Sequence, residues 1–79
     1  MNNSRRKELR RAIDFLEKAH QIITAAQEQE LEGWENLPEG IQESERGEAL
    51  LTNSDELETI ADEIEQQKDC IQDVIDGNL

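Results

Sequence analysis

Glu17 and His20 are the residues of this 79-residue chain whose types and spacing best suit metal binding. They stand three positions apart, so a helix would place both side chains on one face. Carboxylate-bridged di-iron bundles combine such a Glu-x-x-His pair with inward-pointing glutamates from the other helices. The facing part of the chain instead has Leu57, Ile60, Ile64 and Gln67 at the inward positions. Glu63 and Glu65 fall beside them, so we expect no metal here and a histidine bonded to a polar neighbour. A metal-binding helical bundle is kept as a lesser alternative.

Side chains for catalysis lack the partners that they need. Nucleophilic catalysis requires a serine or cysteine beside a base that a third group orients. The chain has one cysteine, Cys70, and no second histidine to support such an arrangement. We expect Cys70 to be a small buried apolar residue beside the helix contact. The sequence also has no phosphate-binding glycine loop and no paired-cysteine zinc motif. It therefore predicts a protein that is not an enzyme and has no cofactor.

The charge of the chain limits its partners. Twenty acidic and eight basic residues give a formal net charge of −12, which argues against direct nucleic-acid binding. A basic protein surface, a cation or a second copy of the chain remain as partners. The basic start has no apolar run after it, and no stretch reaches the roughly 20 apolar residues of a membrane span. With a single cysteine as well, these features predict a cytoplasmic protein without membrane contact.

Apolar periodicity predicts the elements that position these residues. In the first half, the spacing alternates between four and three, as in the contact row of a coiled coil, at Leu9, Ile13, Leu16, His20, Ile23, Gln27, Glu30, Trp34 and Leu37. Ala12, Ala19, Ile22 and Ala26 widen this row. In the second half, the same spacing appears at Leu50, Asn53, Leu57, Ile60, Ile64, Gln67, Ile71 and Val74, with Ala49, Ala61 and Ile75 beside it. We therefore expect two long amphipathic helices.

The connection between the two helices can also be read from the sequence. Pro38 cannot continue a helix but suits the first turn of a new one, and Ser44 can cap the helix that follows. We predict helices over about 4–35 and 44–76, joined by a turn at 36–43 that includes a short helical turn at 38–42. Thr52 begins a second possible capping box, but the periodicity runs through it and favours one continuous helix. Asp76-Gly77-Asn78 resembles a helix stop.

A short connection makes the two helices antiparallel. Positions whose numbers sum to roughly the low eighties should then lie opposite each other, so Trp34 comes near Leu50 and Glu30 near Asn53. Two helices bury only one face each, so a lone hairpin is marginally stable. The predicted fold is all-α: a coiled-coil-like antiparallel two-helix hairpin, one domain over residues 1–79, that forms a homodimeric four-helix bundle.

The two ends of this hairpin should differ in charge. Residues 1–18 carry six basic and three acidic side chains, and they should lie beside the acidic residues of the second helix, from Asp62 to Asp76. The turn end keeps an uncompensated acidic surface. Trp34 at this end suits either an interface anchor or a plug for the end of the bundle. The candidate partner-binding residues are Trp34, Glu35, Glu39, Glu43, Glu45 and Glu48.

The segment Asn36-Leu37-Pro38-Glu39-Gly40-Ile41-Gln42, continued by Ser44-Glu45, resembles the turn of a known group of proteins. These are small, acidic, uncharacterised helical-hairpin proteins of bacteriophages and other mobile elements of bacteria. The resemblance covers roughly residues 30–76. It implies a hairpin fold and a phage origin, with the host cytoplasm as location, but no catalytic residues and no defined activity.

The leading functional hypothesis is a non-enzymatic protein–protein interaction module that binds or inhibits a host or phage protein. An acidic nucleic-acid mimic is the first alternative: spaced carboxylates would take the place of phosphates and block a DNA- or RNA-binding defence protein. The metal-binding bundle is the second alternative. The sequence identifies no particular partner.

Overall fold

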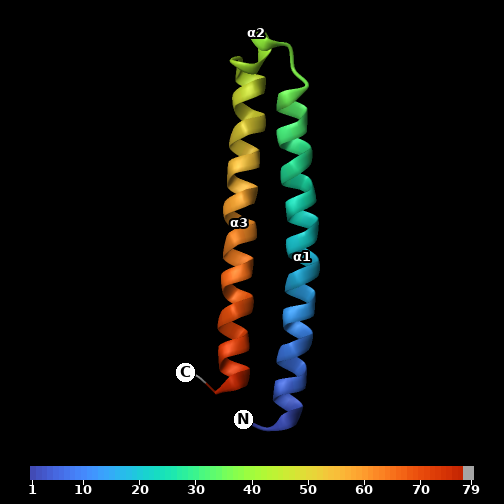
Figure 1. The fold of residues 1–79 in the computed structure, drawn as a ribbon, viewed down its shortest axis with the longest axis vertical. Helices are drawn as coiled ribbons and strands as arrows, with labels where there is room; N and C mark the ends of the chain where they lie inside the picture. The colour runs from blue at the N-terminus through green and yellow to red at the C-terminus, as the bar shows by residue number, and fades with distance from the viewer. Residues whose placement is uncertain (78–79) are drawn as a thin grey trace.

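The computed structural model describes residues 1–77, which form a helical hairpin (Figure 1). Helix α1 spans Asn3–Glu35, α2 is the short turn Glu39–Gln42, and α3 spans Glu45–Asp76. α1 and α3 run antiparallel and contact each other along their length, and the molecule measures 59 × 19 × 13 Å. The predicted all-α hairpin is therefore confirmed. No helix within residues 1–77 combines the length and the apolar character needed to cross a membrane.

Local side chains account for where the helices begin and end. The Asn2 side chain accepts a hydrogen bond from the backbone N–H of Arg5 at 2.8 Å, which caps α1. The Ser44 hydroxyl accepts from the N–H of Gly47 at 3.5 Å and caps α3, which continues through Thr52 without a break. Gly77 ends α3 in the left-handed conformation, with φ of 74°. Asn78, the last residue of the predicted stop, lies outside the described residues.

The contact row predicted for α1 is the row that faces α3. All nine of its positions, from Leu9 to Leu37, are half-buried. The predicted pairing also holds, because the Asn53 amide donates to a Glu30 carboxylate oxygen at 3.3 Å. One turn before Glu30 in α1, the Gln27 amide donates to the hydroxyl of Ser54, the residue after Asn53 in α3, at 2.9 Å. Polar residues within the contact row of α1 thus find partners on α3.

The contact row predicted for α3 is partly wrong. Five of its members are half-buried on the side of α1: Leu50, Leu57, Ile64, Ile71 and Val74. The other three, Asn53, Ile60 and Gln67, are exposed. The second row that faces α1 consists of residues at intervals of seven: Gly47, Ser54, Ala61, Lys68 and Ile75. Small side chains let one helix lie close against another, and Ser54 also supplies a hydroxyl to Gln27. The face that α3 turns towards α1 is therefore centred about 50° from the predicted one, half of the turn of one residue, and lies away from Ile60.

The hairpin has a thin interior. Among the described residues, the buried apolar side chains are Ala61 at 7% exposure and Ile75 at 4%, and no large side chain is completely buried. Five large apolar side chains are exposed: Met1, Phe15, Ile22, Ile41 and Ile60. Two helices thus leave much of their apolar surface in contact with water.

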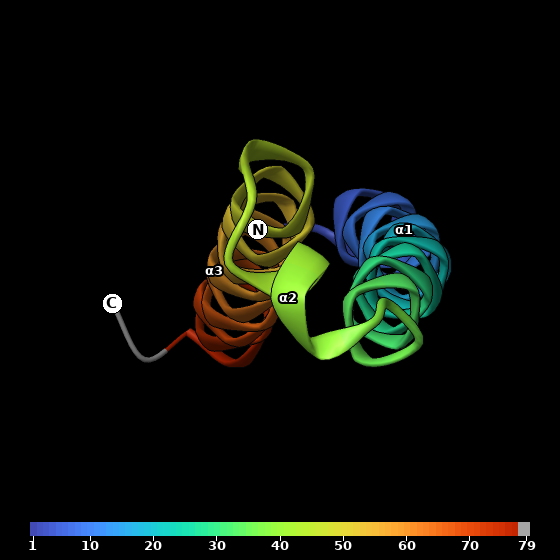
Figure 2. The same cartoon turned by 90° about the horizontal axis from the view of Figure 1, so that it is seen from above.

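The turn is held by contacts between residues on either side of α2. Seen from above, α2 lies across the end of the hairpin (Figure 2). The indole N–H of Trp34 donates to the Gln42 carbonyl at 3.3 Å, and the Gln42 amide donates to the Trp34 carbonyl at 3.2 Å. The backbone of Gln42 also lies against Gly47, where a Cβ atom would collide with the Gln42 carbonyl group. Gly47 is therefore buried beneath the turn and has no room for a side chain.

Replacing Gly47 by alanine should destabilise the protein. The added Cβ can be accommodated only if the backbone of Gln42 moves, and overpacking of this kind costs about 1–3 kcal/mol. Urea unfolding, followed by circular dichroism at one chain concentration, measures the change. Gly40→Ala is the matched control, because a Cβ atom at position 40 would have no neighbour within 4 Å. We expect Gly40→Ala to be neutral or stabilising by up to about 1 kcal/mol. Equal unfolding midpoints for the two variants would contradict this account of the turn.

Candidate functional site

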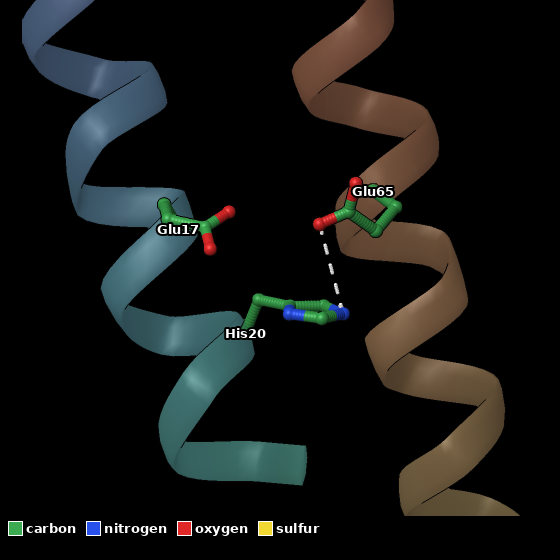
Figure 3. Close-up of side chains that lie close together, drawn as sticks. All are labelled: Glu17, His20 and Glu65. Atoms are coloured by element: carbon green, nitrogen blue, oxygen red, sulfur yellow. Dashed lines mark ion pairs between the residues drawn. The ribbon is translucent and has the colours of Figure 1, made fainter.

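One cluster of potential ligand groups lies halfway along the hairpin (Figure 3). Glu17 and His20 come from adjacent turns of α1, and Glu65 comes from α3. One nitrogen or oxygen atom from each of the three lies within 4.8 Å of the others, and the Nε2 atom of His20 is 3.6 Å from an oxygen of Glu65. All three residues are half-buried. The prediction that no glutamate points inward here is wrong, because the rotation of α3 brings Glu65 towards α1.

Lys68 places a positive charge in this cluster. It belongs to the row Gly47, Ser54, Ala61, Lys68 and Ile75 that faces α1, and its side chain is 17% exposed. Its ammonium group donates to a Glu65 oxygen at 3.1 Å and also to an oxygen of Glu17. The hydrogen bond from Lys68 lowers the pKa of the Glu17 carboxyl below its usual value, and a second bond from Gln21 acts in the same direction. The hydrogen bonds to Glu17 and Glu65 raise the pKa of Lys68.

The chemistry of the cluster is therefore that of an ion-pair network. The two carboxylates share one ammonium group, and His20 faces Glu65 from the other helix. A divalent cation would have to displace the Lys68 ammonium or bind beside it, at a cost in charge repulsion. The side chains join α1 to α3 between Ile64 and Ile71.

The predicted partner-binding glutamates gather at the turn end of the molecule. Glu35 ends α1, Glu39 begins α2, Glu43 follows α2, and Glu45 and Glu48 lie in the first turn of α3. All five are exposed, and within residues 1–77 none of them forms an ion pair. This end of the hairpin thus presents five free carboxylates on three neighbouring elements.

Trp34 lies beside these glutamates but is engaged within the turn. It is half-buried, and its indole N–H already donates to the Gln42 carbonyl. Its indole group therefore helps to hold the end of the hairpin together. Sequence reasoning missed Gln42 and Gly47, which complete this arrangement, because their roles depend on contacts across the turn.

The basic end of α1 is paired differently from the prediction. Arg11 forms an ion pair with Glu8 of the same helix at 2.8 Å. Within the described residues, Arg5, Lys7 and Arg10 form no ion pair with the acidic side chains of α3, and all three are exposed on the surface of α1. The ion pairs between the helices come instead from Lys68 and His20.

Cys70 is exposed and has a free thiol. The prediction that it is buried is wrong because α3 turns a different side towards α1 than expected, as it also does at Ile60. The inner rows of α3 contain Lys68 and Ile71, so position 70 points away from α1. The thiol has no role in the cluster around His20.

No protein-family model, curated protein or solved structure matches this chain. The candidate sites therefore rest on the geometry and charge of the chain itself.

The ion pair between Glu17 and Lys68 should make stability depend on pH. The lowered pKa of Glu17 means that its contribution is present above the usual carboxyl pKa and is lost as pH falls through the folded-state value. The raised pKa of Lys68 means that its contribution is present below the usual lysine pKa and is lost at higher pH. We expect Glu17→Gln to lower the melting temperature at neutral pH but to change it little near about pH 2.

Glu28→Gln is the control for this experiment, because it removes the same charge from an exposed residue of α1 that forms no ion pair. It should leave the melting temperature unchanged or slightly higher at neutral pH. A Glu17→Gln effect that is the same at both pH values would rule out the ion pair as its cause.

Lys68 should also limit metal binding by the cluster. Lys68→Met keeps an unbranched side chain but removes the ammonium group, so Glu17, His20 and Glu65 become free to bind a cation. We expect titration with Co²⁺, followed by visible absorption, to show tighter binding to Lys68→Met than to the unchanged protein. The double variant Lys68→Met/His20→Ala should lose this gain. Equally tight binding to the unchanged protein would contradict the competing role of Lys68 and favour a metal-binding function.

Proposed function

We propose that the chain is a non-enzymatic protein–protein interaction module that works as a pair of hairpins associated in a four-helix bundle. The thin interior carries this proposal. Large apolar side chains such as Phe15 and Ile22 remain exposed, whereas burial of such a side chain contributes about 1.5–3 kcal/mol. Small chains commonly complete their core by associating. A second hairpin supplies the missing apolar surface.

The proposed working surface for another protein is the acidic turn end. Its five exposed glutamates, Glu35 to Glu48, suit a partner with a basic surface, because complementary charge raises the rate and specificity of association. Trp34 and Gln42 hold α2 in place and thereby position these carboxylates. Binding or inhibition of a host or phage protein fits such a surface. A phage origin stays a prediction that depends on the resemblance of the turn.

An acidic nucleic-acid mimic is the second candidate function. It is favoured by the uneven pairing of charge, since all four ion pairs of the described residues lie outside residues 21–64. The acidic side chains of the turn end thus have no paired cation within residues 1–77, and they could take the place of the phosphates of a nucleic acid. A DNA- or RNA-binding protein would be the target of such a surface.

Capture of proteins from a bacterial lysate should distinguish the turn end from general acidity. One variant changes Glu35, Glu39, Glu43, Glu45 and Glu48 to glutamine. The control makes five equivalent changes at exposed acidic positions of α3: Asp55, Glu56, Glu58, Asp62 and Glu63. Both variants lose the same charge. We expect the control to retain the partner and the turn variant to lose it. Equal capture by both variants would place the working surface elsewhere.

An excess of duplex DNA added to the captured complex separates the two functions. A nucleic-acid mimic occupies the DNA-binding surface of its target, so DNA should compete with it and release it, and the complex should weaken as salt is raised. For the leading proposal we expect the complex to persist.

A further inference from the structure

A second apolar stripe runs along α1 and is not covered by the rest of the hairpin. Its residues alternate in spacing between three and four, as in a coiled-coil contact row: Ala12, Phe15, Ala19, Ile22 and Ala26. Phe15 is 59% exposed and Ile22 is 70% exposed. Ala12, Ala19 and Ala26 are half-buried, because they border the row that faces α3. α1 therefore carries one contact row for α3 and a second row beside it.

The geometry of the helix turns this stripe away from α3. Phe15 and Ile22 each come one residue before a member of the row that faces α3, Leu16 and Ile23. One residue turns a helix by about 100°, so the stripe lies about 100° around α1 from that row. α2 lies at the far end of the molecule and cannot reach the stripe (Figure 1). A shallow groove between the helices adjoins the stripe at Leu16 and extends the apolar surface to Ile60 and Ile64.

Charge along α1 indicates what covers the stripe. Exposed basic side chains, among them Arg5, Lys7 and Arg11, come at or before its start, and the exposed glutamates Glu28, Glu32 and Glu35 follow its end. A second α1 turned end for end would place the bases of each helix opposite the acids of the other. A parallel copy would place like charges together and would join two acidic turn ends. The stripe thus matches an antiparallel copy of itself.

We propose that this stripe binds the same stripe of a second copy, with the two α1 helices antiparallel and a two-fold axis beside Ala19. The inference rests on the proposed association of two hairpins and defines its surface and orientation. Residue 19 is the midpoint of Asn3–Glu35, so the two helices overlap along their whole length. In a two-fold interface each contact occurs twice, and here residues whose numbers sum to about 38 lie opposite each other.

This arrangement gives the exposed side chains definite partners. Phe15 packs beside Ile22 of the second copy, and Ile22 packs beside Phe15. The small side chain of Ala19 lies at the axis and lets the two helices approach closely. Arg5 comes near Glu32 of the second copy, and Glu8 lies opposite its Gln29. The acidic turn ends point in opposite directions and stay free for another partner.

Disulfide cross-linking of the full chain tests the surface. The background is Cys70→Ser, so that the exposed native thiol does not react. Ala19→Cys places two thiols beside the axis, within the Cα separation of about 4–7 Å that a disulfide needs. Ala25→Cys is the control, because it is exposed on α1 but lies far from its own copy in an antiparallel pair. Thiols paired in a dimer have an effective concentration near millimolar, so Ala19→Cys should cross-link about a hundredfold faster than Ala25→Cys at a chain concentration of about 10 μM.

A mixture of Glu8→Cys and Gln29→Cys chains, each in the Cys70→Ser background, tests the orientation. The antiparallel pair brings positions 8 and 29 together, so we expect disulfides between the two kinds of chain. Disulfides within each kind would show a parallel pair and overturn the proposed orientation.

Sedimentation equilibrium separates this inference from the association on which it rests. We expect the unchanged protein to have the mass of a dimer and the double variant Phe15→Ser/Ile22→Ser to be monomeric or to lose its helical structure. Either loss supports the interface, since both side chains are exposed in a lone hairpin. A monomeric unchanged protein would overturn both proposals. A dimer whose Ala19→Cys variant cross-links no faster than Ala25→Cys would overturn the stripe and leave the association standing.

Discussion

Three small residues at intervals of seven, Gly47, Ser54 and Ala61, are buried along the side of α3 that faces α1. They determine how the two helices fit together. At the turn, the missing side chain of Gly47 makes room for the backbone of Gln42. In the middle, Ser54 gives a hydroxyl to Gln27 of α1. A larger residue at position 47 would displace the backbone of Gln42.

The same fit explains the polar cluster and the thin interior. Continuing the row by seven residues brings Lys68 to the inside, and Glu65 comes with it towards His20. The hairpin thus has an ion-pair network where a larger protein would have apolar packing. Ile60 is left outside, and α1 keeps Phe15 and Ile22 in water. Small inner residues let the two helices pair but bury little surface, which is the ground for the proposed association of two hairpins.

Features that depend on local chemistry could be predicted from the sequence. Ser44 caps α3, and Pro38 separates α1 from the short helix α2. The contact row of α1 follows from the spacing of its apolar residues. The rotation of α3 could not be predicted in this way. Periodicity gives weight to large apolar side chains, so it selected Ile60 over Ala61 and placed Glu65 and Cys70 wrongly as a consequence. The pairing of Trp34 with Gln42 and the contact at Gly47 join residues across the turn, and spacing along the chain does not report such contacts. The turn glutamates were found from charge alone and are exposed, but their binding role is a proposal.

We propose that one hairpin is incomplete and that two copies fold as a unit. Thermal unfolding at a series of chain concentrations, from about 1 μM to about 100 μM, tests it most directly, because association stabilises the folded state by mass action. We expect a melting temperature that rises steadily with chain concentration. A cooperative transition at the same temperature throughout this range would contradict it.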